Sequence, residues 1–237
     1  MKVLEQLQIA KISSKKLLAI LLDPEKVDVS KITEVIENIK ALSADFILVG
    51  GSVVSKNKTQ VLVNKLKKRT SLKIILFPGD VSQISENADA LLFLSLLSGT
   101  NPEYLVNQQI KAAPQLKNSS LEILPTAYIL IDGGTVSSVQ KQSQTEPLNP
   151  KDINLIYHTA LAGQLMGKKL IYLEAGSGAK NPVSESIISK VSSLTIPIIV
   201  GGGIRSLKDI EMAYKSGADL VIIGTAFEEN TLLLEAQ

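Results

Sequence analysis

The sequence predicts a single α/β domain folded as a (β/α)8 TIM barrel. Eight short apolar runs, rich in Ile, Leu and Val with little alternation, recur along the 237 residues, as is typical of strands buried on both faces. They begin near Leu17, Asp45, Lys73, Asp89, Ile123, Leu170, Pro197 and Asp219. Helical segments separate several of these runs, and a repeat of about 30 residues per strand–helix unit suits the barrel. A doubly wound open sheet is the alternative, and no linker divides residues 1–237.

The helical period is clear in three of the intervening segments, which are Val29–Leu42, Gln60–Arg69 and Leu207–Ser216. The polar residues before Leu17 predict a helix that closes the bottom of the barrel. Residues 132–152 are polar, have no strong helical pattern, and predict a functional or mobile loop. The chain after Gly224 leaves room for a last helix of only about two or three turns.

Composition excludes several classes of function. The chain has no cysteine, which rules out disulfides, a thiolate nucleophile and Cys-ligated zinc, and a single histidine, His158, which rules out a two-His metal site. We expect His158 to be a packing or surface residue. A net charge of +2 and 4% aromatic residues argue against nucleic-acid binding. No signal peptide or run near the ~20 apolar residues of a membrane span is present, so we expect a cytoplasmic protein.

Two glycine-rich loops near the end of the chain predict a phosphate site. Gly201-Gly202-Gly203 follows the seventh apolar run, and Gly224-Thr225 follows the eighth. In barrel enzymes a phosphate commonly binds the loops after strands 7 and 8, where glycines let backbone N–H groups approach the anion. A tight turn is the simpler reading of either loop alone, but the pair around one amphipathic helix is far more specific.

Polar residues also end three of the other predicted strands. Asp23 follows the first run and Ser52 the second, so both belong to the strand ends where barrel active sites are built; a carboxylate there suits Mg²⁺. Alternation places Tyr172 and Glu174 of the sixth run on one face. An unpaired glutamate inside a barrel is costly, which favours a functional role for Glu174. The structural alternatives are an Asp-Pro turn or a helix cap for Asp23, a helix cap for Ser52, and an ion pair with a lysine or a helix cap for Glu174.

Together, these residues resemble the geranylgeranylglyceryl phosphate synthase family, which includes the bacterial heptaprenylglyceryl phosphate synthases. The apolar run Leu91–Leu97, whose end could line a groove for a lipid chain, leads into one of the matching motifs. In chain order the motifs are LLDPEK (Leu21–Lys26), VGGS (Val49–Ser52), FLSLLSGTNPEYL (Phe93–Leu105), AYILIDGG (Ala127–Gly134), YLEAGSG (Tyr172–Gly178), VGGGI (Val200–Ile204) and IIGTA (Ile222–Ala226).

The resemblance implies a barrel enzyme that transfers a prenyl group from its diphosphate to the C3 hydroxyl of sn-glycerol 1-phosphate, with Mg²⁺ and release of diphosphate. It implies a metal site at Asp23 and Ser52. It implies glycerol phosphate binding by Tyr172, Leu173, Glu174, Ala175, Gly176, Ser177, Gly178, Gly202, Gly203, Gly224 and Thr225. Glu174 is the candidate base for the hydroxyl. A homodimer or an assembly of dimers, and loose membrane association without a membrane segment, are also expected.

One departure bears on the donor. The heptaprenyl branch has a lysine two positions before the metal aspartate, where this chain has Leu21, which favours a C20 geranylgeranyl donor. The alternatives are the same reaction with another chain length, another phosphate-binding barrel enzyme such as an isomerase or a thiamine-phosphate-synthase-like transferase, and a non-catalytic phosphate-binding barrel.

Overall fold

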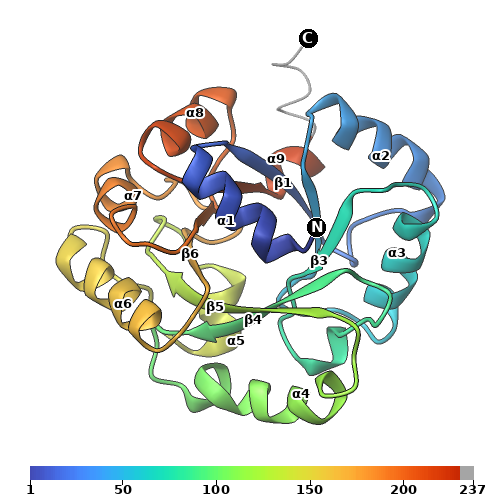
Figure 1. Cartoon of the computed structure of the whole chain (residues 1–237), viewed down its shortest axis with the longest axis horizontal. Coiled ribbons are helices and arrows are strands. Elements are labelled where there is room, and N and C mark those ends of the chain that lie inside the picture. Colours follow the sequence, from blue (N-terminus) through green and yellow to red (C-terminus); the bar gives the residue numbers. More distant parts are fainter. Residues whose placement is uncertain (230–237) are drawn as a thin grey trace.

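The computed structural model describes residues 1–229, and its eight strands close into one parallel barrel in chain order (Figure 1). Each strand pairs with the next, and β8 pairs with β1 through Leu17↔Leu220 to Ile20↔Ile223. The strands are β1 (Leu17–Leu22), β2 (Phe46–Val49), β3 (Lys73–Leu76), β4 (Ala90–Leu96), β5 (Glu122–Leu130), β6 (Leu170–Glu174), β7 (Ile198–Gly201) and β8 (Leu220–Ile223). The prediction of a (β/α)8 barrel is therefore confirmed, and the open-sheet alternative was wrong.

The helices form a ring around the barrel, with α1 set across one end (Figure 1). They are α1 (Val3–Ser13), α2 (Ile32–Ala41), α3 (Lys58–Lys67), α4 (Gln108–Leu116), α5 (Ser138–Ser143), α6 (Ile153–Leu165), α7 (Glu185–Val191), α8 (Leu207–Lys215) and α9 (Thr225–Glu228). Two 3₁₀ turns, Val29–Lys31 and Val81–Gln83, and a π-helical turn, Glu103–Asn107, complete the described elements. The three predicted helices correspond to α2, α3 and α8.

The differences from the predicted helices have local causes. The Asp28 carboxylate accepts a hydrogen bond from the Ser30 N–H, so the segment from Val29 begins as a 3₁₀ turn before α2. The polar stretch 132–152 contains α5, which is capped by the Ser137 hydroxyl. The last helix, α9, has one turn in the described chain; the remainder of that prediction falls on residues 230–237, outside the described residues.

The helix before the barrel closes its amino-terminal end, as predicted. Val3, Leu7 and Ala10 of α1 are buried against the inward-facing side chains of the strands. The backbone N–H groups of Val3 and Leu4 donate to the carboxylate of Glu122, at the start of β5, over 2.6 and 3.0 Å. This end of the barrel is sealed, which leaves the opposite, carboxyl end of the strands for a ligand.

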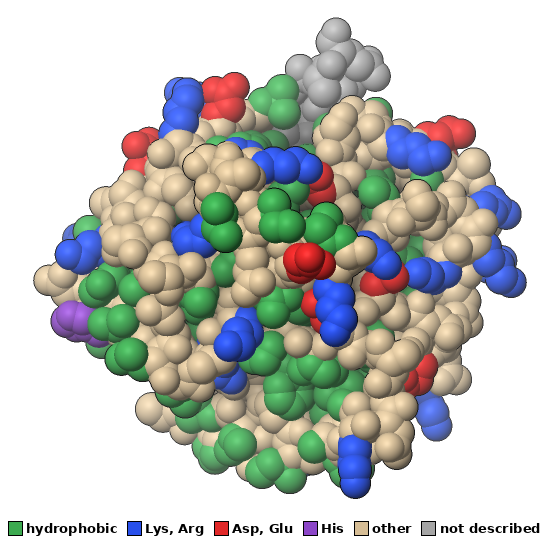
Figure 2. All heavy atoms as spheres, in the orientation of Figure 1, with side chains coloured by type: hydrophobic (Ala, Val, Ile, Leu, Met, Phe, Trp, Pro, Cys, Tyr) green, Lys and Arg blue, Asp and Glu red, His purple; other side chains and the backbone are tan. Residues whose placement is uncertain are grey.

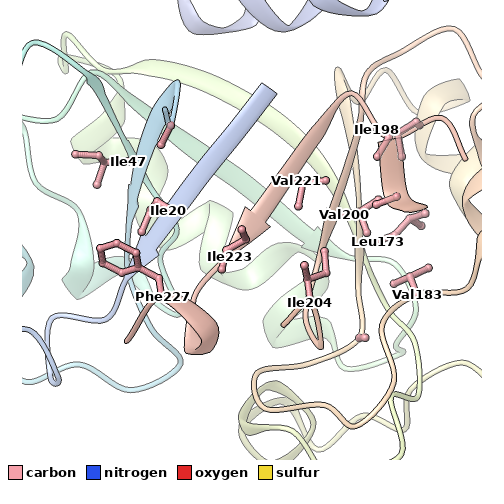
Figure 3. Close-up of a cluster of buried hydrophobic side chains, with 14 of the residues drawn as sticks. Ile20, Ile47, Leu173, Val183, Ile198, Val200, Ile204, Val221, Ile223 and Phe227 are labelled. Carbon is pink, nitrogen blue, oxygen red and sulfur yellow. The ribbon is translucent and has the colours of Figure 1, made fainter. Parts of the chain in front are cut away.

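Alternating strand residues separate two cores. One set fills the barrel interior, and the other packs between the sheet and the helices, as Figure 3 shows for Val200, Leu173 and Ile198 beside Val183. Burial of apolar surface stabilises the fold by about 25 cal/mol per Å². Because both faces of each strand are buried, the strands are apolar throughout.

The surface agrees with the compositional exclusions. Basic and acidic side chains are interspersed on the face shown in Figure 2, with no large field of one sign there. His158 is exposed on α6, so the prediction of a surface or packing residue holds. Within residues 1–229, no helix is both long enough and apolar enough to cross a membrane.

A candidate active site at the carboxyl end of the barrel

The predicted phosphate loops meet at one edge of a polar cavity. Gly178, Gly202, Gly203 and Thr225 line this cavity together with Ser177, whose hydroxyl lies 3.4 Å from that of Thr225. The Arg205 guanidinium donates to the carbonyls of Gly178 and Ala179, over 3.3 and 3.2 Å, and so ties the loop after β7 to the loop after β6. The loops therefore lie at the same end of the barrel, as a shared phosphate site requires.

Close backbone packing explains why this edge is built from glycine. A Cβ atom on Gly202, which has φ +79°, would lie 2.3 Å from Glu174 Oε1 and 2.6 Å from the backbone nitrogen of Gly176. A Cβ atom on Gly201 would lie 2.5 Å from the Tyr172 hydroxyl. Gly201 at the end of β7 and Gly202 directly after it thus let Tyr172 and Glu174 occupy the space beside the loop.

Glu174 lies at the inner wall of the cavity, at the end of β6. Its side chain is only 6% exposed, and Oε1 accepts a 2.7 Å hydrogen bond from the Gly176 N–H. Burial raises the pKa of the Glu174 carboxyl above its ordinary value, while hydrogen bonds from the Tyr172 hydroxyl and from Gly176 oppose the shift. A carboxylate with a raised pKa in a cavity is suited to accept a proton.

Asp23 and Ser52 also line this cavity, at the ends of β1 and β2. Because Gly51 has no Cβ, the Asp23 carboxylate can lie beside it; a Cβ would be 3.0 Å from Oδ1. Glu25 ties the two loops together, since its carboxylate accepts 2.5 Å hydrogen bonds from the Ser55 N–H and the Lys58 ammonium. This pairing lowers the pKa of Glu25 to about 2.

The donor set fits Mg²⁺ better than a metal caged by protein alone. No cluster of three or more His, Cys, Asp or Glu side chains within residues 1–229 could hold a metal. Mg²⁺ needs only one or two carboxylates when phosphate oxygens and water complete its six ligands. One carboxylate, Asp23, and one hydroxyl, Ser52, in the same cavity as the glycine loops that are predicted to bind phosphate, fit that requirement.

An apolar groove adjoins the polar cavity, and Gly51, Phe77 and Tyr128 line both. The connection from β3 to β4 contains only the 3₁₀ turn Val81–Gln83 instead of a helix, so the end of β4 is open on that side. Residues 91–94 and Ala112 of α4 line the groove, and the side-chain amide of Gln109 holds α4 to the carbonyl of Leu94. The groove therefore begins where the sequence predicted a lipid-binding surface.

Ten of the thirteen predicted site residues line the polar cavity. They are Asp23, Ser52, Tyr172, Glu174, Ser177, Gly178, Gly202, Gly203, Gly224 and Thr225. Leu173 does not, because alternation points its buried side chain into the outer core (Figure 3). Ala175 and Gly176 are also buried behind the cavity wall, although the Gly176 N–H contacts Glu174.

Four of the lining residues that the sequence interpretation missed bear on the chemistry of the site. Lys26 and Arg205 line the polar cavity, and Phe77 and Tyr128 line both the cavity and the groove. Lys26 forms a 2.7 Å ion pair with Glu228 of α9. Lys26 and Tyr128 lie within motifs that carry the resemblance, whereas Phe77 and Arg205 lie outside them. Only the position of these residues at or near strand ends could have pointed to them.

Comparison with known proteins gives a consistent result. The model of the PcrB family matches residues 10–236. The geranylgeranylglyceryl phosphate synthase of Zunongwangia profunda is 52% identical over 228 residues, which cover 96% of this chain and 97% of that protein. The geranylgeranylglyceryl phosphate synthase of Methanosphaera stadtmanae is 39% identical over 211 residues, which cover 88% of this chain and 86% of that protein.

Solved structures agree with the sequence relatives. The crystal structure of (S)-3-O-geranylgeranylglyceryl phosphate synthase from Thermoplasma acidophilum in complex with sn-glycerol-1-phosphate superimposes with a TM-score of 0.92 at 35% identity. The match covers all of this chain and 95% of that one. An aldolase with a TM-score of 0.58 and 14% identity shares the barrel fold alone.

Proposed function

This chain belongs to the PcrB family, and we propose on that premise that it is a prenyltransferase acting on sn-glycerol 1-phosphate. It moves a geranylgeranyl group from its diphosphate to the C3 hydroxyl and forms an ether-lipid precursor. The observation that carries the proposal is the junction of two unlike cavities at one barrel mouth. One is edged by glycine loops and a buried carboxylate, and the other is apolar.

The polar cavity suits the acceptor. Backbone N–H groups of the loops at Gly202-Gly203 and Gly224-Thr225 would bind its phosphate, because glycine lets the chain approach the oxygens closely. The glycerol hydroxyls would then lie toward Tyr172 and Glu174, on the inner wall. Glu174 takes the proton of the C3 hydroxyl as that oxygen attacks, and Tyr172 orients the carboxylate through its hydrogen bond.

The groove and the β1–β2 edge suit the donor. The prenyl chain would lie along β4 and α4, where apolar side chains exclude water from the allylic carbon. Its diphosphate would lie at Asp23 and Ser52, which would hold Mg²⁺. When bound, Mg²⁺ neutralises negative charge on the diphosphate as it leaves.

The length of the donor is tested by kinetics with farnesyl (C15), geranylgeranyl (C20) and heptaprenyl (C35) diphosphate. Each donor is varied alone while sn-glycerol 1-phosphate is held at saturation. We expect the highest kcat/KM with the C20 donor. The matched control is sn-glycerol 3-phosphate, which should not be alkylated. A clear preference for the C35 donor would overturn the donor assignment, and absence of transfer from all three would overturn the function.

The wider setting is also part of the proposal. We propose that the enzyme works in the cytoplasm and associates loosely with membranes, because its donor and product both carry a long apolar chain. The chain is further expected to form a homodimer or an assembly of dimers. Light scattering at micromolar concentration should give at least twice the 25.5 kDa mass of one chain. A monomer across that range would contradict the assembly.

A further inference from the structure

Tyr128 carries a buried hydroxyl that no group in the described chain satisfies. Its side chain is 4% exposed, lies on β5, and its OH has no hydrogen-bond partner within residues 1–229. Burying a hydroxyl without a partner is costly, and replacing it with an apolar group of the same shape removes that cost. We therefore expect the Tyr128 hydroxyl to form its hydrogen bond with a bound ligand.

The ring of Tyr128 lies at the boundary between the two cavities. Tyr128 is in register with Tyr172 on the neighbouring strand, with ring centroids 5.2 Å apart. Phe77 of the β3 end lies 5.9 Å from Tyr128 and 5.4 Å from Tyr172, so the three rings contact one another. Phe77 and Tyr128 line both cavities, whereas Tyr172 lines only the polar one.

This placement assigns Tyr128 to the donor side of the reaction. Glu174 already receives its hydrogen bonds from Tyr172 and from the Gly176 N–H, so it leaves the Tyr128 hydroxyl unpaired. Tyr128 lies one strand nearer the groove. The atoms that must meet at the junction are the donor's first carbon, its ester oxygen and the C3 oxygen of the acceptor. Of these, the ester oxygen is the one that gains charge next to the groove.

We propose that Tyr128 is a catalytic residue whose hydroxyl donates a hydrogen bond to the ester oxygen of the prenyl diphosphate as that oxygen leaves. The inference rests on the proposed function. The bond between the allylic carbon and the ester oxygen breaks, and its electron pair leaves with diphosphate. The C3 oxygen forms the new bond to that carbon, and its proton goes to Glu174. Tyr128 keeps its proton throughout.

The surroundings keep the hydroxyl in its donating form. Burial, together with the nearby charge of Glu174, raises the pKa of Tyr128 well above its ordinary value. The ring therefore stays neutral at any pH at which the enzyme works. A donor fixed in a dry site before the reaction stabilises developing charge without reorganisation.

The test compares Tyr128→Phe with Tyr214→Phe. Tyr214 is the matched control, because its hydroxyl donates a 2.7 Å hydrogen bond to the Leu17 carbonyl at the sealed end of the barrel. For Tyr128→Phe we expect a single-turnover rate at least tenfold lower, an unfolding temperature equal to or above wild type, and unchanged affinity for sn-glycerol 1-phosphate by calorimetry. For Tyr214→Phe we expect a lower unfolding temperature and an unchanged rate.

The outcomes separate this inference from the proposed function. A Tyr128→Phe rate within twofold of wild type would overturn the catalytic role while leaving the function intact. A rate loss matched by a lower unfolding temperature and weaker acceptor binding would also overturn it, because the residue would then be structural. Absence of prenyl transfer by the wild-type protein would instead overturn the function itself.

Discussion

Replacing Glu174 with Gln is expected to lower kcat by about 100-fold or more, since a positioned general base contributes ~10²–10⁴-fold to the rate. Glutamine keeps the length of the side chain and can still accept the hydrogen bond from the Gly176 N–H, but it cannot take the C3 proton. Binding of sn-glycerol 1-phosphate should stay within about tenfold of wild type. Calorimetry of the acceptor, run beside single-turnover rates, measures the two effects separately.

The pH dependence gives a second signature of Glu174. Because burial raises its pKa, the carboxyl remains protonated to a higher pH than an ordinary glutamate, and the wild-type rate should fall as the pH drops through that raised pKa. The residual activity of Glu174→Gln should lose this acid limb. If Glu174 only positions the substrate, the variant would lose binding and kcat/KM together with little separate loss in kcat. Near-normal single-turnover chemistry would rule out the base.

The second large effect is expected at Asp23. Asp23→Asn should abolish Mg²⁺-dependent transfer while leaving the fold intact, because a residue at the carboxyl end of a barrel strand serves the site more than stability. Mg²⁺ binding should also be lost, since a neutral amide replaces the carboxylate that we propose as the metal ligand. Calorimetric titration of Mg²⁺ in the presence of inorganic diphosphate measures this directly, without turnover.

Asp152→Asn is a matched control for Asp23→Asn. Asp152 caps α6 by accepting a hydrogen bond from the Leu155 N–H, and asparagine caps helices equally well. This control should bind Mg²⁺ and turn over like wild type. Mg²⁺ binding retained by Asp23→Asn, or wild-type activity that persists in EDTA, would contradict the metal assignment.

The barrel itself was predictable because its signal is local. Each strand is a short apolar run, and every observed strand begins within one residue of its predicted start. The same alternation placed Tyr172 and Glu174 on the inward face, where the structure has them. Alternation also points the Leu173 side chain outward, so any contact of Leu173 with the substrate, which the resemblance implies, would have to come from its backbone.

The groove and its rings were less predictable because they depend on tertiary arrangement. The groove lies where no α-helix connects β3 to β4. In the sequence, this feature appears only as an unusually short spacing between two apolar runs. From the sequence, Tyr128 is one residue of an apolar strand. Its contacts with the rings of Phe77 and Tyr172 appear only in the structure. Arg205 joins two loops that are 27 residues apart, which no local pattern records.

Product analysis tests most directly whether the two cavities serve one alkyl transfer. The purified chain is incubated with geranylgeranyl diphosphate, sn-glycerol 1-phosphate and Mg²⁺, and the lipid product and released diphosphate are quantified by mass spectrometry and phosphorus NMR. We predict one diphosphate released for each geranylgeranylglyceryl phosphate formed, with the ether at C3. Unchanged donor, or diphosphate release accompanied only by geranylgeraniol from hydrolysis, would contradict the proposed function.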